Sequence, residues 1–190
     1  MMHETVDKVD RIVAENKEIW KSKAMFFSFL KGIVRRGWVR HPVKIKLINK
    51  LRKQIPNPNP KGKKPTVWGA TCEICGNDFV IGDMEVDHKQ NETANLVQLS
   101  DIQSCAEMLL CVVEDDLRLI CKGCHSTHSY SQKMGIPFEE AVIEKKIIAL
   151  MKDRKKCLVM LEEHGYDTKT LKNETKRREA LRQIFKGEQV

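Results

Sequence analysis

The sequence contains two Cys-x-x-Cys segments, Cys72-Glu73-Ile74-Cys75 and Cys121-Lys122-Gly123-Cys124, and Cys121 follows Cys75 by 46 positions. Each segment places two thiolates on one tight turn, and Gly76 and Gly123 supply the backbone freedom that such turns use. Four thiolates in a tetrahedral array suit Zn²⁺, and a site filled by four cysteines has no open position for a substrate. We therefore predict a structural Zn²⁺ site formed by these four cysteines.

Three of the seven cysteines lie outside these segments, namely Cys105, Cys111 and Cys157. We expect each to be a small buried hydrophobic residue rather than a ligand. A redox role for the Cys-x-x-Cys segments is the weaker interpretation, because the sequence has no thioredoxin-like βαβ pattern.

Charge is unevenly distributed along the 190 residues, whose formal net charge is +8. Residues 1–70 hold 17 Lys/Arg and 5 Asp/Glu, whereas residues 71–131 hold 3 Lys/Arg and 11 Asp/Glu. No acidic residue occurs between Ile19 and Cys72. Basic flanks around an acidic centre are typical of a protein that holds cations at its centre and binds a polyanion.

No apolar run reaches the roughly 18–20 residues of a membrane-spanning helix, and the first 23 residues do not have the pattern of a signal peptide. We therefore expect an intracellular protein that makes no membrane contact.

The pattern of apolar residues predicts an α+β protein. We expect helices over residues 3–30, 93–113, 123–133, 138–164 and 169–186, with Gly32 and Gly37 interrupting the first apolar face. Residues 43–53 begin like a strand, but their apolar spacing favours a basic helix that starts near Pro42. The Gly82-Asp83 pair predicts a hairpin of 79–81 with 84–86.

The same pattern suggests four regions. Residues 1–55 form a basic helical region, and residues 56–67, rich in proline and lysine, form an extended linker. Residues 68–133 form a core that contains both cysteine pairs, and residues 134–190 form a C-terminal helical region.

A second group of candidate residues lies between and beside the cysteines. It consists of Asp87-His88, Asp115-Asp116, His125 and His128. Three of the six histidines thus lie within or next to the cysteine framework, and His88 follows an acidic residue. This grouping favours a functional role over an isolated structural histidine.

Residues 68–131 resemble the HNH endonucleases, which have a ββα-metal fold. The resemblance rests on Cys72-x-x-Cys75-Gly76, on Glu85-Val86-Asp87-His88, and on the segment from Asp116 to His125 that includes Cys121-x-x-Cys124. It implies an HNH nuclease core over residues 68–133, flanked by basic helical segments. It further implies that His88 is the general base and that Asp87 and His125 bind a catalytic metal. The family's usual products are 5′-phosphate and 3′-hydroxyl ends.

The sequence departs from the family at Asp116, where an asparagine is usual. In the family this residue helps to fix the loop that holds the catalytic histidine. Asp116 can accept the same hydrogen bonds but lacks the amide donor, so it can orient His88, add a metal ligand or mark a weakened enzyme. The insertion between His88 and Asp116 is longer than the family's shortest loop and suggests a lid or a partner surface.

The chemistry of phosphodiester hydrolysis agrees with these roles. Because the unperturbed pKa of histidine is about 6.5, His88 can accept a proton near neutral pH. An Asp and a His suit Mg²⁺ or Mn²⁺, and also tolerate Ni²⁺ or Zn²⁺. His128 lies one helical turn after His125 and either contacts metal or phosphate or is simply an exposed helix residue.

The basic N-terminal part supplies candidate DNA contacts. These are Arg35, Arg36, Arg40, Lys44, Lys46, Lys50, Arg52, Lys53, Lys61, Lys63 and Lys64. Contacts of this kind bind phosphates and carry little sequence information. A second contact is suggested by Lys172, Lys176, Arg177, Arg178 and Arg182. For Trp38 and Trp68 we favour packing in the core over stacking on bases.

Two functions therefore stay open. The first is a metal-dependent DNA endonuclease of HNH type, a class common in phages and mobile elements. One such site normally cuts one strand, so double-strand cutting implies a homodimer or two visits. The alternative is a non-catalytic zinc-ribbon protein that binds nucleic acid, which needs the four cysteines but not Asp87, His88 or His125.

Overall fold

A computed structural model describes residues 8–59, 61–90 and 96–187. It is a mixed α+β structure with small antiparallel sheets. The chain divides into two compact units, Met1–Cys121 and Lys122–Val190, and each is described by itself below. This boundary falls inside the 68–133 region of the sequence prediction. In the described part of the chain, no helix has the length and apolar character needed to cross a membrane.

The N-terminal helices are α1 (Lys8–Glu15) and α2 (Lys23–Val39). The predicted continuous helix over 3–30 is therefore wrong at residues 16–22, and residues 3–7 lie outside the described part. Ser22 caps α2, because its hydroxyl accepts a hydrogen bond from the Met25 amide at 3.2 Å. Gly32 and Gly37 do not interrupt α2, contrary to expectation.

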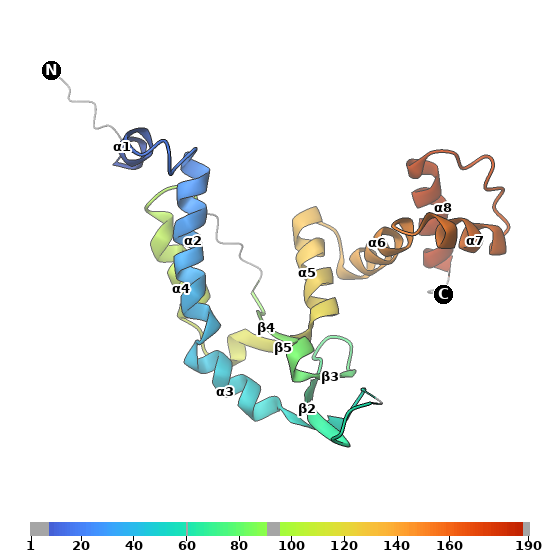
Figure 1. Ribbon diagram of the computed structural model, residues 1–190, viewed down its shortest axis with the longest axis horizontal. Coiled ribbons are helices and arrows are strands. Elements are labelled where there is room, and N and C mark those ends of the chain that lie inside the picture. Colours follow the sequence, from blue (N-terminus) through green and yellow to red (C-terminus); the bar gives the residue numbers. More distant parts are fainter. Residues whose placement is uncertain (1–7, 60, 91–95, 188–190) are drawn as a thin grey trace. The chain divides into compact units, whose positions relative to one another are not determined.

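Helix α4 (Asp101–Leu110) packs along α2, as Figure 1 shows. Val9, Phe27, Leu96 and Cys105 form the buried centre of this helical cluster. Of the predicted helix over 93–113, only the α4 residues are helical, and residues 93–95 lie outside the described part. The insertion after His88 therefore contributes a helix that packs against the N-terminal region.

Helix α3 (Pro42–Leu51) confirms the preference for a helix over a strand, with Pro42 in its first turn. After Leu51 the backbone becomes extended and enters β1 (Lys53–Pro56). Leu47 is the buried contact residue of α3. This helix joins the helical cluster to the sheet.

Strands β1, β2 (Thr66–Thr71) and β3 (Asp78–Val80) form one antiparallel sheet in that order. The proline- and lysine-rich segment is thus not an extended linker. Its ends pair in β1 and β2, and residues 57–59 and 61–65 belong to the loop between these two strands. Gly69 in the central strand is required by packing, since a Cβ there would collide with Ile55 and the Phe79 carbonyl.

Strand β4 (Met84–His88) pairs antiparallel with β5 (Leu117–Cys121) in a second sheet. The predicted hairpin of 79–81 with 84–86 is wrong, because β3 pairs with β2 instead and a 3-10 turn, Ile81–Asp83, separates β3 from β4. The Gly82-Asp83 pair suggested one hairpin, whereas β3 pairs with the preceding strand β2 across residues 72–77, and only β4 pairs with a distant strand, β5. Leu117, Leu119 and Ile120 are almost fully buried.

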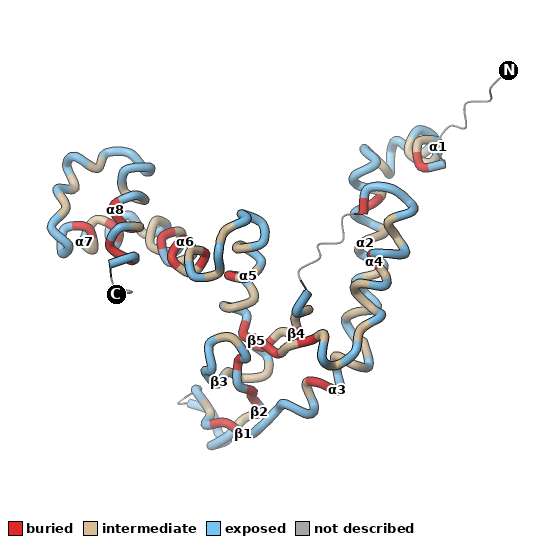
Figure 2. Tube along the Cα trace, turned by 180° about the vertical axis from the view of Figure 1, so that it is seen from behind, coloured by how far each residue is buried: buried red, intermediate tan, exposed pale blue. Residues whose placement is uncertain are grey.

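The second unit is helical and contains α5 (Lys122–Met134), α6 (Phe138–Met151), α7 (Arg154–Glu163) and α8 (Glu174–Gly187). The predicted helix over 138–164 is broken between α6 and α7. Asp153 explains the break, since its carboxylate accepts a hydrogen bond from the Lys156 amide and caps α7. Figure 2 shows buried positions on α6, α7 and α8, where Ile147, Leu161 and Leu181 are fully buried.

Candidate functional site

The four cysteines of the two Cys-x-x-Cys segments lie together. Cys72 and Cys75 follow β2, Cys121 ends β5, and Cys124 lies in the first turn of α5. Their sulfur atoms all lie within 4.8 Å of one another. Among the described residues, no other group of three or more His, Cys, Asp and Glu side chains converges in this way.

Backbone amides stabilise the thiolate form of Cys72. The Cys121 amide donates to Cys72 Sγ over 3.3 Å. Burial raises the pKa of the Cys72 thiol, but hydrogen bonds from the backbone amides of Cys75, Cys121 and Ile74 and from the Cys75 side chain bring it down to about 7. The Gly76 amide closes the turn on the Cys72 carbonyl at 2.9 Å, with Gly76 at φ +70°. Four thiols with amide donors fit a bound metal such as zinc.

The three remaining cysteines lie outside this cluster. Cys105 and Cys157 are buried in separate apolar cores, as expected for small hydrophobic residues. Cys111 is exposed, contrary to expectation, because it follows the last residue of α4.

Asp87 makes a cross-strand ion pair with Arg118. The two residues are directly opposite in the β4–β5 ladder. Arg118 Nε and Nη2 both donate to Asp87 Oδ2, at 2.9 and 2.7 Å. Only 14% of the Asp87 side chain and 17% of the Arg118 side chain are exposed, so solvent screens this pair little. The carboxylate predicted to hold a catalytic metal is therefore engaged by a cation of the chain itself.

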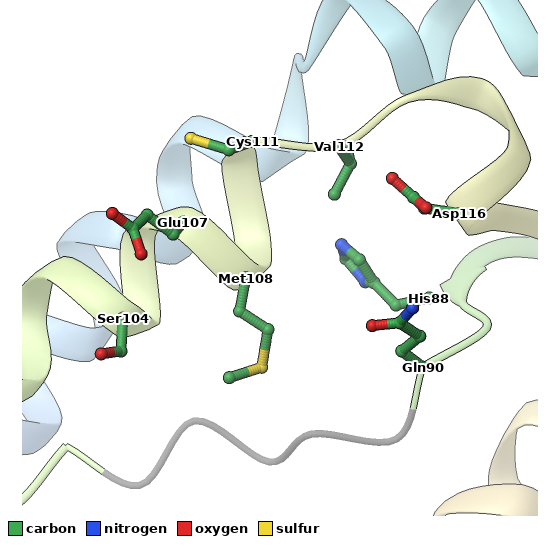
Figure 3. Close-up of a pocket in the computed structure, with 8 residues that line it drawn as sticks. All are labelled: His88, Gln90, Ser104, Glu107, Met108, Cys111, Val112 and Asp116. Carbon is green, nitrogen blue, oxygen red and sulfur yellow. The ribbon is translucent and has the colours of Figure 1, made fainter.

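His88 ends β4 and lines a cavity of about 370 Å³. Figure 3 shows its imidazole facing this cavity together with Asp116 and Val112, opposite residues of α4. The Trp38 ring stacks on it, with 4.5 Å between ring centroids and 37° between ring planes. His88 Nε2 is buried and has no hydrogen-bond partner among the described residues. A buried imidazole nitrogen without a partner is costly, which is typical of a functional position.

Asp116 anchors the chain around His88 through its backbone. Its carbonyl accepts a hydrogen bond from the Lys89 amide at 2.8 Å, immediately after His88. Its carboxylate accepts from the Val113 amide at 2.8 Å and thereby closes the 3-10 turn Glu114–Asp116. Asp116 thus fixes the turn next to His88 through its backbone carbonyl, and its carboxylate bonds within that turn rather than to a group of His88.

The two remaining histidines of the prediction lie on α5, in the second unit. His128 Nδ1 lies 3.2 Å from the side-chain amide nitrogen of Gln132. The ring centroids of His128 and Phe138 are 6.5 Å apart. His125 follows Cys124 in the first turn of the same helix and is partly buried.

The predicted DNA-binding residues lie on α2, on α3 and on the β1–β2 hairpin, and all but the partly buried Lys44 are exposed. Several are already paired. Lys46 and Lys50 contact Glu114, and the hydrogen bond from Lys50 lowers the pKa of that carboxyl. Lys53 contacts Asp78 at 2.8 Å. The loop residues Lys61, Lys63 and Lys64 project from the hairpin.

Of the second predicted DNA contact, Lys172 and Lys176 are exposed, whereas the three arginines are engaged within the second unit. Arg178 and Arg182 bind the buried carboxylate of Glu144, at 3.3 and 2.6 Å, and Arg177 donates to two backbone carbonyls. These arginines stabilise the second unit from within, and the sequence pattern gave no sign of their buried partner.

Arg118 was missed by the sequence analysis, which also favoured packing in the core for two tryptophans whose surroundings differ from that expectation. Arg118 was not considered, although its position opposite Asp87 follows once the strand register is known. Trp38 contacts His88, and Trp68 is 47% exposed rather than packed in the core. No local sequence signal distinguishes these tryptophans from core residues.

Comparison of the chain with protein-family models, with curated proteins and with solved structures gives no match.

Proposed function

We propose that the protein is a metal-dependent DNA endonuclease of the HNH type. The observation that carries this proposal is the β4–β5 register. It pairs His88 with Leu117, the first residue of β5, and so places Asp87-His88 next to Asp116, which directly precedes β5. Helix α5, with His125 in its first turn, follows β5 directly in the chain. Two antiparallel strands and a following helix that carry these residues in this order are what the HNH resemblance implies.

His88 is the proposed general base. Its imidazole lines the cavity, and the Lys89–Asp116 backbone hydrogen bond fixes the chain next to it. The Nε2 atom has no partner to compete for a proton among the described residues. An imidazole nitrogen is the side-chain group most often used to accept a proton from an attacking water.

Asp87 and His125 are the proposed ligands of a divalent cation, since a carboxylate oxygen and an imidazole nitrogen suit Mg²⁺ or Mn²⁺ in their donor chemistry. When bound, such a cation supplies charge stabilisation to the phosphate and to the leaving 3′-oxygen. Arg118 donates two hydrogen bonds to Asp87 Oδ2, so its positive charge opposes a cation at this carboxylate.

The cysteine cluster has a structural role in this proposal. With four thiolates it leaves no open position, and it ties the β2–β3 turn to the end of β5 and the start of α5. The exposed lysines and arginines of α2, α3 and the β1–β2 hairpin would bind DNA phosphates, and this binding would weaken with rising salt.

The test is cleavage of supercoiled plasmid by the zinc-loaded full-length chain, with added Mg²⁺ or Mn²⁺ or with no added metal. We expect conversion to nicked or linear plasmid only when the metal is added. The proposal fails if a folded, zinc-containing protein converts no plasmid with either cation.

A second candidate is a non-catalytic zinc-containing protein that binds nucleic acid. It is favoured by the Arg118–Asp87 ion pair, in which a cation of the chain itself already binds the carboxylate that a metal would need. In this case the protein retards DNA, retains zinc, cuts nothing and binds no second metal.

A further inference from the structure

Trp68 is the least buried of the three tryptophans. It lies on β2 with 47% of its surface exposed, even though the Arg52 guanidinium sits over its ring at 4.7 Å from the ring centroid. The other two tryptophans are half-buried and contact rings of their own unit. Trp68 therefore presents an indole ring at the surface of the sheet, next to a cation.

The surroundings of Trp68 form a groove of about 430 Å³ on the β1–β2 hairpin. It is lined by Gln54, Lys64, Pro65, Thr66, Val67 and Trp68. Gln54 is the direct cross-strand neighbour of Trp68. Among the described residues, no carboxylate lines the groove, and the β1–β2 loop carries Lys61 and Lys63 as well.

Hydrogen bonds among the described residues of the β1–β2 loop fix parts of its backbone. The Asn57 amide donates to the Pro65 carbonyl at 2.9 Å, and the Asn57 side chain donates to the Lys64 carbonyl at 2.8 Å. The Lys61 amide donates to the Asn59 side chain at 3.0 Å. The backbone of Lys64, a lining residue of the groove, is therefore fixed by Asn57 before any ligand arrives, which lowers the entropy cost of binding.

We infer that this groove binds an unpaired nucleotide of DNA, with its base stacked on Trp68. The flat indole and the guanidinium of Arg52 suit the π-face of a base, the Gln54 amide can hydrogen-bond a base edge, and Lys64 can bind the adjoining phosphate. A base inside a duplex cannot offer its face, so the site selects single-stranded or unpaired segments. The inference rests on the proposed function only in taking DNA as the ligand.

The test is fluorescence anisotropy of a labelled single-stranded 20-mer and of the matching duplex, with the zinc-loaded full-length chain and without added Mg²⁺ or Mn²⁺. We expect Trp68→Ala to weaken single-strand binding by about 5- to 100-fold, the range found for base-stacking aromatic residues. Trp68→Phe keeps a stacking face and should cost less. Duplex binding should change by less than about twofold, because phosphate contacts dominate it.

Two controls separate stacking from a general loss of structure. Val159→Ala, at an exposed apolar residue of the second unit, should leave both affinities unchanged. A single-stranded oligonucleotide of abasic sites should bind wild type as weakly as Trp68→Ala, and the variant should not distinguish it from the normal strand. The zinc content of every variant should stay at the wild-type value.

The inference is overturned if Trp68→Ala binds single strands within twofold of wild type, or loses single-strand and duplex binding equally. If wild type binds neither the single strand nor the duplex, both this inference and the proposed function fail. If wild type cuts plasmid while Trp68→Ala binds single strands normally, only this inference fails.

Discussion

Arg118 and Asp87 face each other across the β4–β5 ladder and are joined by two hydrogen bonds to one carboxylate oxygen, at 2.9 and 2.7 Å. A guanidinium is permanently charged, so it opposes any divalent cation that approaches Asp87. The pair therefore defines a competition between an internal ion pair and an exchangeable metal.

Replacing Arg118 with Gln should strengthen metal binding at Asp87. Like charges about 4 Å apart near a protein surface repel by about 4 kcal/mol before screening, so we expect at least a tenfold gain in affinity for Mn²⁺. The affinity is measured by titrating the zinc-loaded protein with Mn²⁺ and following the concentration of free Mn²⁺ by electron paramagnetic resonance.

The control for this variant is Arg154→Gln, which removes the same charge at the start of α7. It should leave the Mn²⁺ affinity unchanged. If neither wild type nor Arg118→Gln takes up Mn²⁺, then Asp87 is not a metal ligand and the ion pair is purely structural.

Trp38 should control access to His88, because the two rings stack and Nε2 is buried. In Trp38→Ala we expect His88 to react several-fold faster with diethyl pyrocarbonate than in wild type. Mass spectrometry of the modified peptide gives the rate, and Trp68→Ala is the control at an exposed tryptophan. Equal rates in wild type and Trp38→Ala would show that other residues bury the imidazole.

Loss of the cysteine cluster should unfold the first unit. Cys72→Ser removes a buried ligand, so we expect one equivalent of zinc to be lost by elemental analysis. Because zinc binding of this kind contributes on the order of 10 kcal/mol to folding, thermal stability should fall by about 10 °C or more. Cys111→Ser, at an exposed cysteine outside the cluster, should change neither quantity; an unchanged zinc content in Cys72→Ser would exclude the four-cysteine site.

The second unit depends on Glu144, which is only 6% exposed and binds Arg178 and Arg182. Arg182→Ala leaves this carboxylate with one partner, and we expect a loss of roughly 1–3 kcal/mol in the free energy of unfolding. Urea denaturation measures it. Glu179→Ala removes only the exposed partner of Arg182 and should cost less than about 0.5 kcal/mol. An equal effect of both variants would contradict a special role for Glu144.

The parts of the structure that local rules specify could be predicted from the sequence. Two Cys-x-x-Cys turns at chelating spacing are enough to predict the cluster, and Pro42 with the apolar spacing after it predicts α3. Asp153 is an N-cap residue that separates α7 from α6, and such a residue can be recognised in a sequence. The prediction followed the continuous apolar pattern instead and missed this break.

The parts that depend on distant contacts could not be predicted. The Gly82-Asp83 pair suggested a local hairpin, yet β3 already pairs with β2 across residues 72–77, and β4 pairs with β5, which lies about 30 residues further along the chain. The contact of Arg118 with Asp87 requires that register, and the exposure of Trp68 requires the β1–β2 hairpin. The sequence therefore predicted which residues belong to the candidate site, but it did not predict which side chains contact one another.

The central claim is that His88 acts as the base of a nuclease. The most direct measurement is the rate of plasmid nicking in Mn²⁺ by wild type, by His88→Ala and by His164→Ala, all with equal zinc content. The account predicts that His88→Ala is slower by at least about 100-fold and that His164→Ala, at an exposed histidine after α7, equals wild type. Nicking by His88→Ala at the wild-type rate would contradict it.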